Sequence, residues 1–290
     1  MKGLGSMEWL SPKHAGFYYG GKKAVDFYNE MHLRRNNKYI SKIDENDQRC
    51  KQLTNNGFVN LGQLFDHDIL DLIKDKVEFS IKNKKNLKSI DNHYATIADP
   101  FLVSDEVFKL SFDERLIEFA TNYFKCTPGI GTFNLRKSFV NKLPPATTQL
   151  FHRDKNSIRF FKYFIYLNDV NTKEDGPLTL VDNSWNMIPV DYQKQYRWTE
   201  KEIKNYYGDQ CLKYLTAKKG DVIAGLTTCY HRGTKPKAKE RTMLTINYLI
   251  HPELYDGQPG VYEQPFKLKK EQFESLEDDK KPVADFLLKI

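Results

Sequence analysis

The pattern of apolar and turn-forming residues changes near residue 128, and this change limits the folds that the chain can adopt. Beyond it, short runs rich in β-branched and aromatic residues alternate with turns built on Gly, Pro, Asn and Asp. Such runs predict strands, and many short strands separated by turns predict a sandwich or a barrel. The runs cover residues 129–140, 148–152, 159–167, 178–181, 221–224, 227–231 and 241–250. We therefore expect a mainly β core with flanking helices.

The region before this change carries a helical pattern. Apolar side chains at helical spacing occupy residues 24–33, 65–81 and 111–124. Ser111, with Glu114 three residues later, predicts the N-cap of the last of these helices. A short strand is expected at 57–61, after a turn that ends at Gly57.

We expect one domain over residues 1–290, because the sequence has no internal repeat, low-complexity segment or linker. A mainly helical N-terminal layer (1–125) would pack on the β core (126–252). A polar and aromatic insert at 185–215 predicts a helical excursion over one mouth of the barrel. Residues 253–290 form a C-terminal extension.

The charge of the chain is only mildly basic, at +7 from 45 Lys and Arg against 38 Asp and Glu. No basic stripe of the kind typical of nucleic-acid-binding proteins is visible, so nucleic acid is not the expected partner. The densest basic run comprises Lys82, Lys84, Lys85 and Lys88. It fits either a solvated helix end or a surface that attracts an acidic small molecule.

The four cysteines form no CxxC pair and no zinc-binding spacing. The N-terminus lacks the apolar run of a signal peptide, and no stretch is apolar enough for a transmembrane helix. These features predict a cytoplasmic protein that does not act in a membrane. The sequence does not specify an oligomeric state.

A candidate metal site begins with the triplet His152-Arg153-Asp154. In a strand, residues i and i+2 point to the same face, so His152 and Asp154 can direct an imidazole and a carboxylate to one point. Arg153 would then point away. Such triplets are common by chance, so this one indicates a metal site only if a third ligand can be identified.

His231 is the candidate third ligand, 79 residues after His152. It follows a turn and strand at 220–224. Two histidines and one carboxylate on one face of an ion leave coordination positions open, which suits a non-haem Fe(II) that admits a co-substrate and O2. The five other histidines have no partner at ligand spacing.

Arg241 adds a cation ten residues after His231. A turn between them predicts that the strand carrying Arg241 returns beside His231. A guanidinium there can bind the distal carboxylate of 2-oxoglutarate with two charge-assisted hydrogen bonds, while the keto-acid end reaches the iron.

The order of these motifs resembles the phytanoyl-CoA dioxygenase family of Fe(II)/2-oxoglutarate-dependent oxygenases. The resemblance covers roughly residues 110 to 250. The matching segments are 149–154, 162–170, 175–181, 220–223 and 231–241.

This resemblance implies a double-stranded β-helix, or jelly-roll, with the iron inside one mouth. It implies that O2 and 2-oxoglutarate are consumed, with release of succinate and CO2, and that ascorbate stimulates the reaction. Hydroxylation of a substrate C–H bond is the default outcome. Family members often have a Gly-Ser-His element where this chain has Trp185, so the substrate pocket is expected to differ. The retained Asp154 disfavours halogenation, because halogenating relatives have a small residue in its place.

Several further residues are candidates for the pocket. Gln149 and Lys162 are candidate ligands of 2-oxoglutarate. For Lys162 the sequence leaves a second orientation open, in which the side chain extends outward to solvent. Asn134, Arg136 and Ser138 alternate along one strand and are candidates, with Trp185, for contact with the substrate.

Three classes of function fit this sequence. The leading one is an oxygenase of a small molecule such as a glycan, an acyl thioester or a secondary metabolite, and the basic excess favours an anionic one. The second is a cupin-like module that binds a metal or ligand without turnover. The third is an oxygenase of protein or nucleic acid, which would need a basic groove or an aromatic platform.

Overall fold

The structure is a computed structural model of the 290-residue chain. It describes residues 30, 34–35, 43–154, 156, 159–182, 184, 197–250 and 265–290. Most of the helix expected at 24–33, and residues 185–196 of the insert expected at 185–215, lie outside the described residues. Among the described residues, none of the helices has the length and apolar character to span a membrane.

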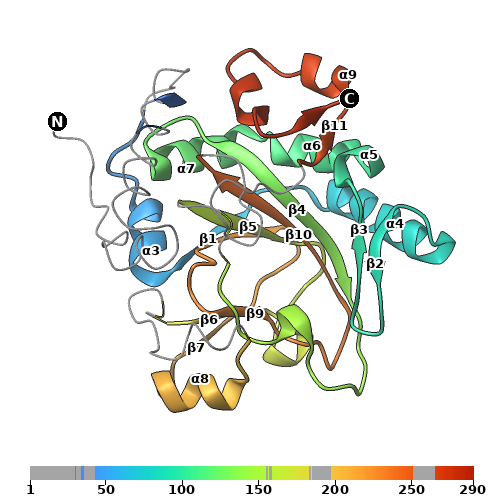
Figure 1. The fold of residues 1–290 in the computed structure, drawn as a ribbon, viewed down its shortest axis with the longest axis vertical. Coiled ribbons are helices and arrows are strands. Elements are labelled where there is room, and N and C mark those ends of the chain that lie inside the picture. Colours follow the sequence, from blue (N-terminus) through green and yellow to red (C-terminus); the bar gives the residue numbers. More distant parts are fainter. Residues whose placement is uncertain are drawn as a thin grey trace.

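A seven-stranded sheet forms the centre of the fold (Figure 1). All of its pairings are antiparallel. In spatial order its strands are β1 (Phe58–Gln63), β8 (Asp221–Gly225), β5 (Phe160–Tyr166), β10 (Arg241–Leu249), β4 (Gly129–Ser138), β3 (Tyr94–Ile97) and β2 (Leu87–Ile90).

A second, three-stranded antiparallel sheet lies below the large sheet in Figure 1. Its spatial order is β7 (Leu212–Leu215), β6 (Leu178–Val181) and β9 (His231–Gly233). Tyr166 of the large sheet connects the two, because its hydroxyl donates to Leu215 O at 2.9 Å and accepts from Leu178 N at 3.0 Å. The two sheets thus enclose a common interior.

The helices flank these sheets. They are α3 (Gln48–Asn56), α4 (His67–Asn83), α5 (Pro100–Val103), α6 (Asp105–Ser111), α7 (Glu114–Phe124), α8 (Glu200–Tyr207) and α9 (Lys270–Glu274). The C-terminal segment adds the parallel pair β11 (Lys267–Leu268) and β12 (Leu288–Lys289) above the large sheet (Figure 1). The expectation of mainly β structure with flanking helices is confirmed.

One face of the large sheet packs against helices. Alternate residues of β5 and β10 point to this face, as the two-residue period of a strand requires. Phe161, Tyr163 and Tyr248 are buried there, and Phe119 of α7 meets Phe161 edge-on at 5.6 Å between ring centroids. The Tyr163 hydroxyl donates to Leu116 O at 2.7 Å, so this polar group is satisfied inside the core.

The opposite face of the same strands carries polar side chains. The register places Ser138 opposite Arg241, Arg136 opposite Met243, and Asn134 opposite Thr245. On the other side of β10, Lys162 lies opposite Asn247. A one-residue shift would exchange these groups with the core aromatics, so burial of the aromatics also sets the position of the polar row.

The structure revises two sequence expectations for the N-terminal region. The described part of the region before residue 125 contains α3 to α7 and the strand expected at 57–61 (β1), but it also contributes β2 and β3 to the large sheet, which the sequence pattern did not indicate. Ser111 ends α6, where its hydroxyl donates to Val107 O. The N-cap of α7 is Asp113, whose carboxylate accepts from Arg115 N.

Two of the expected core strands are also shorter than the pattern indicated. Residues 147–149 form a 3-10 turn, and pairing begins only at Phe151 and His152. Most of 227–231 is a turn, and β9 begins at His231. In the expected insert, the described part forms α8 but also β7, which pairs with β6.

The turn at Gly176 offers a test of the close packing between the turn before β6 and the segment after β9. Gly176 has φ +78°, and an added Cβ would lie 2.7 Å from Thr234 O and 2.8 Å from Pro236 N. We expect Gly176→Ala to lower the free energy of unfolding by about 2–5 kcal/mol in urea denaturation. Gly62→Ala is the control, because Gly62 has φ +81° but open space around it, and should cost only about 1–2 kcal/mol. Equal losses would show that the close contacts at Gly176 are unimportant.

Candidate active site

Two backbone hydrogen bonds place His152 and His231 side by side. His152 N donates to His231 O at 3.0 Å, and His231 N donates to His152 O at 2.9 Å. This isolated bridge joins the segment after the 3-10 turn to β9. Directly paired residues of antiparallel segments project to the same side, and the two imidazole centroids lie 4.3 Å apart.

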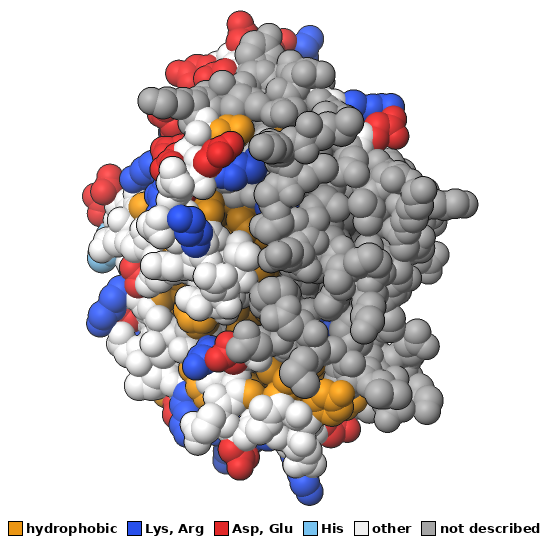
Figure 2. Space-filling view, turned by 90° about the vertical axis from the view of Figure 1, so that its left-hand side faces the viewer, with side chains coloured by type: hydrophobic (Ala, Val, Ile, Leu, Met, Phe, Trp, Pro, Cys, Tyr) orange, Lys and Arg blue, Asp and Glu red, His pale blue; other side chains and the backbone are white. Residues whose placement is uncertain are grey.

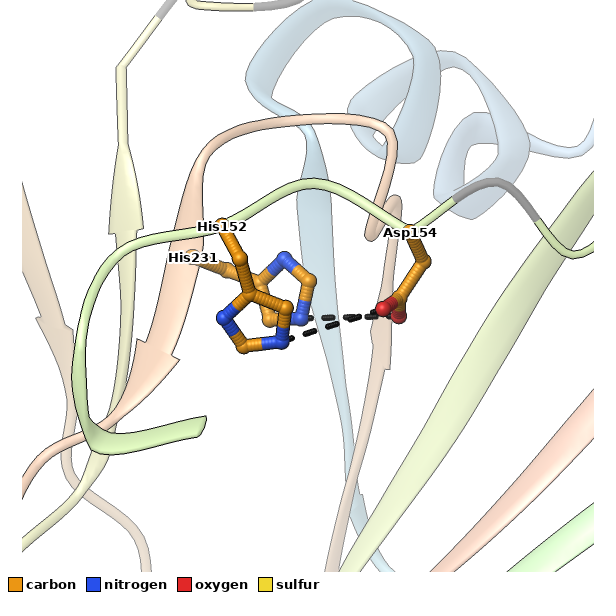
Figure 3. Close-up of side chains that lie close together, drawn as sticks. All are labelled: His152, Asp154 and His231. Atoms are coloured by element: carbon orange, nitrogen blue, oxygen red, sulfur yellow. Dashed lines mark ion pairs between the residues drawn. The ribbon is translucent and has the colours of Figure 1, made fainter. Parts of the chain in front are cut away.

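Asp154 completes the cluster from the same segment as His152. Its backbone N–H donates to Thr227 O at 2.9 Å, which continues the pairing beyond the two histidines. The carboxylate faces both rings, with Oδ1 3.8 Å from His152 Nε2 and Oδ2 3.5 Å from His231 Nε2 (Figure 3). The intervening Arg153 points away, as expected, and its Nε donates to Thr228 O.

Lys162 of β5 points inward and binds the candidate ligand Asp154. Its Nζ lies 2.7 Å from Asp154 Oδ2. Burial by itself would raise the pKa of the Asp154 carboxyl, but Lys162 and the two imidazoles outweigh burial and hold that pKa well below its usual range. Asp154 is therefore an anion at neutral pH, as a metal ligand must be.

The second nitrogen of each imidazole, Nδ1, forms a hydrogen bond to a backbone carbonyl. Nδ1 of His152 donates to Leu150 O at 2.9 Å, and Nδ1 of His231 donates to Cys229 O at 3.1 Å. A carbonyl oxygen only accepts, so each Nδ1 carries the proton and each Nε2 presents a lone pair to the cluster. Burial, with repulsion from His231, lowers the pKa of His152 well below its ordinary value, and burial also lowers the pKa of His231.

The donor set fits a divalent transition-metal ion. The three ligand atoms all lie within 4.8 Å of one another. Adjacent ligands of one ion lie roughly 3 Å apart when each bond is about 2.1 Å long. The side chains would therefore need to move inward by less than about 1 Å. Two imidazoles and a carboxylate on one side leave the other side of such an ion open.

This cluster opens into a cavity of about 620 Å³ between the sheets. Phe164 of the large sheet and Leu178 of the small sheet both line it. The structure places most of the site residues expected from the sequence in this lining. They are Asn134, Arg136, Ser138, Gln149, His152, Asp154, Lys162, His231 and Arg241. Trp185 lies outside the described residues.

Arg241 lies in the wall of the cavity and is 4% exposed. Its Nη1 donates to Gly176 O, and its Nη2 donates to Ser138 Oγ at 3.0 Å. Burial lowers its pKa to about 10, so it is still charged at neutral pH. Within the part of the chain that the structure describes, Arg241 has no ion pair and its Nε has no hydrogen-bond partner. A buried charge in this state favours an anionic ligand.

Two neutral side chains of the cavity also have hydrogen-bonding capacity in reserve. Gln149 uses its Oε1 to accept from Ala146 N at 3.2 Å, but its Nε2 has no partner among the described residues. Asn134 Oδ1 is likewise buried and without a partner in those residues. A ligand that offers both acceptor and donor groups would satisfy them.

The sequence pattern missed a set of residues around Arg136. Thr96 and Thr148 accept from its Nε at 3.1 Å and its Nη1 at 2.8 Å, and the Tyr94 ring lies 4.0 Å from the guanidinium carbon. Tyr94 and Thr96 alternate along β3, which is a signal for one face of a strand. The alternation alone does not show that this face lies beside Arg136, because that depends on the pairing of β3 with β4.

Comparison with known proteins yields relatives in structure only. No protein-family model matches the chain, and no curated protein matches it in sequence. HygX from Streptomyces hygroscopicus, solved with nickel, 2-oxoglutarate and hygromycin B bound, has a TM-score of 0.55 at 12% identity. The match covers 77% of this chain and 90% of HygX.

Two further solved structures come from nogalamycin biosynthesis. The non-heme alpha ketoglutarate dependent epimerase SnoN has a TM-score of 0.52 at 14% identity, over 76% of this chain and 91% of SnoN. The corresponding carbocyclase SnoK has a TM-score of 0.54 at 14% identity, over 78% of this chain and 97% of SnoK. At such identities the likeness shows that this chain shares their fold.

The buried histidines predict a specific dependence of stability on pH. Unfolded histidine has a pKa of about 6.5, and both folded values are lower. The neutral rings therefore contribute stability that is present above about pH 6.5 and is lost as the pH falls. We expect the free energy of unfolding of the metal-free protein to fall below about pH 6.5, by up to about 1.4 kcal/mol per pH unit for each histidine.

Urea denaturation in the presence of a chelator, at a series of pH values, measures this effect. The double variant His152→Gln/His231→Gln should show a flatter profile over the same range. An unchanged slope in that variant would assign the pH dependence to other groups.

Proposed function

We propose that this chain is a non-haem Fe(II)/2-oxoglutarate-dependent oxygenase with a double-stranded β-helix core. The observation that carries the proposal is one cavity that combines a His-Asp-His cluster with a buried arginine that has no carboxylate partner among the described residues. The two facing sheets and the fold shared with HygX, SnoN and SnoK support it. Membership of the phytanoyl-CoA dioxygenase family, which the order of the sequence motifs resembles, is part of this proposal.

The side chains have separate tasks in the proposed reaction. His152, Asp154 and His231 hold the iron, and the Nδ1 bonds to backbone carbonyls fix the two rings in the correct tautomer. Arg241 binds the distal carboxylate of 2-oxoglutarate. Gln149 donates from its Nε2 to the co-substrate or the substrate. Lys162 positions the Asp154 carboxylate and limits its rotation.

An iron ion held by His152, Asp154 and His231 would supply the reductive activation of O2 that is coupled to conversion of 2-oxoglutarate to succinate and CO2. Ascorbate would stimulate turnover by keeping the iron reduced. We propose hydroxylation of an unactivated C–H bond as the outcome. SnoN and SnoK are described as an epimerase and a carbocyclase, so structures of this fold also serve other outcomes.

A small molecule is the proposed substrate. The cavity of about 620 Å³ is in the range typical of small-molecule sites. On the face shown in Figure 2, the described Lys and Arg side chains are interspersed with Asp and Glu. That distribution is typical of an ordinary solvated surface, whereas nucleic-acid-binding proteins gather basic residues in a stripe.

Removal of one ligand tests the metal site. We expect His152→Ala or His231→Ala to weaken Fe(II) or Ni(II) binding by at least about 100-fold in anaerobic titration calorimetry, and to abolish succinate release. His67→Ala is the matched control, because His67 lies on the surface beside Gln63 and outside the cavity. Wild-type affinity in the cluster variants would disprove the ligand assignment.

Arg241 provides a test of co-substrate binding. We expect Arg241→Gln to weaken 2-oxoglutarate binding to the Ni(II)-loaded protein by about 100-fold, since two charge-assisted hydrogen bonds contribute roughly 3 kcal/mol. Arg241→Lys should recover only part of the loss, because an ammonium does not form the two-point contact. Retained Ni(II) binding shows that each variant is folded. A wild-type protein that binds metal but not 2-oxoglutarate would instead be a metal-binding module without turnover.

A further inference from the structure

The charges that line the cavity do not balance. Five cations and two carboxylates face it, and each carboxylate has a cation as its partner. Lys162 pairs with Asp154 at 2.7 Å, and Lys267 pairs with Asp99 at 3.7 Å. The cations without an ion pair in the described part of the chain are Lys88, Arg136 and Arg241. The proposed co-substrate accounts for Arg241 and leaves two cations.

Arg136 and Arg241 lie near enough for their charges to repel each other, but their guanidiniums donate to different partners. Arg241 reaches across to Gly176, in the turn that leads into the small sheet. Arg136 reaches toward the edge of the large sheet, where Thr96 and Thr148 accept its hydrogen bonds. A single 2-oxoglutarate bound to the metal and Arg241 therefore leaves the Arg136 guanidinium for another ligand.

The guanidinium of Arg136 is held in place before any ligand arrives. The Tyr94 ring covers it at 4.0 Å, and the two threonine contacts fix its orientation. Burial lowers the pKa of Arg136, while Tyr94 and Asp91 oppose that shift. Its Nη2 has no hydrogen-bond partner among the described residues. A fixed guanidinium with an unused donor edge fits a planar carboxylate or a phosphate.

Lys88 stands at the rim of the same part of the cavity. It lies on the exposed edge strand β2 and belongs to the basic run at residues 82–88. Of the two interpretations of that run, attraction of an acidic small molecule fits Lys88, because this lysine lines the cavity. The other three lysines of the run do not line it.

We propose that Arg136, assisted by Lys88, forms a second anion-binding subsite that recognises a carboxylate or phosphate group of the primary substrate. This inference rests on the proposed function, since it assigns Arg241 to 2-oxoglutarate. It makes Arg136 a specificity-determining residue. The anionic group would anchor the substrate at the Tyr94 end of the cavity, while the carbon to be oxidised faces the metal.

Two simple anions test the subsite without knowledge of the substrate. The protein loaded with Ni(II) and saturating 2-oxoglutarate is titrated by calorimetry with inorganic phosphate and, separately, with acetate at low ionic strength. We expect saturable binding of at least one anion, and the tighter of the two indicates whether the substrate carries a phosphate or a carboxylate. Arg136→Gln should weaken that binding by about tenfold or more, as loss of a charge-assisted hydrogen bond requires.

Matched variants separate the subsite from a general effect of charge. Lys88→Gln should weaken anion binding by about two- to fivefold, as an exposed charge does, whereas Lys85→Gln in the same run should leave it unchanged. Arg136→Lys should retain part of the affinity. If Arg136→Gln does not fold, Lys88→Gln and Arg136→Lys test the subsite instead. Each should bind the anion more weakly than the wild-type protein does.

Two results would overturn the proposal. One is a wild-type protein that binds 2-oxoglutarate but neither anion. The other is an Arg136→Gln protein that loses 2-oxoglutarate binding but keeps anion binding, which would assign Arg136 to the co-substrate. Failure of the proposed function has a different signature, because the wild-type protein would then not bind 2-oxoglutarate at all.

Discussion

The candidate site depends on one pair of backbone hydrogen bonds, between His152 and His231. This pair joins two segments that are 79 residues apart and turns both imidazoles to the same side. The next contact along the segment, from Asp154 N to Thr227 O, brings the carboxylate to the same point. The Nδ1 bonds to Leu150 and Cys229 then fix each ring. Backbone pairing therefore creates the cluster, and the side chains only refine it.

The large sheet supports this site by having two chemically different faces. Aromatic residues such as Tyr163 and Tyr248 pack beneath the helices and bury their hydroxyls in hydrogen bonds to backbone carbonyls. On the opposite face, β5, β4 and β10 carry Lys162, Arg136 and Arg241 into the cavity. Since the period of a strand is two residues, the apolar face sets the register that places the polar face. The packing of the core therefore also determines the geometry of the site.

The buried Arg241 and the half-buried Arg136 make the cavity costly in the absence of ligands. Arg241 and Arg136 are held by neutral oxygen atoms and have no carboxylate partner among the described residues, so their desolvation is only partly compensated. Local features that reduce stability are characteristic of functional sites. The two guanidiniums are oriented in advance, which lowers the entropy lost when an anion binds. The same charges would allow the proposed anionic co-substrate and the proposed anionic group of the substrate to bind in one cavity.

The sequence by itself determined the strand periodicity of the core, the types of side chain in the His-Asp-His cluster, and the position of Arg241 ten residues after His231. These features are local or depend on residue chemistry, so they are visible without a fold. Only the tertiary structure decided that Lys162 turns inward to Asp154, and that β3 brings Tyr94 and Thr96 to Arg136. The physical reason is that pairing between distant strands depends on the register of the whole sheet, which no local pattern specifies.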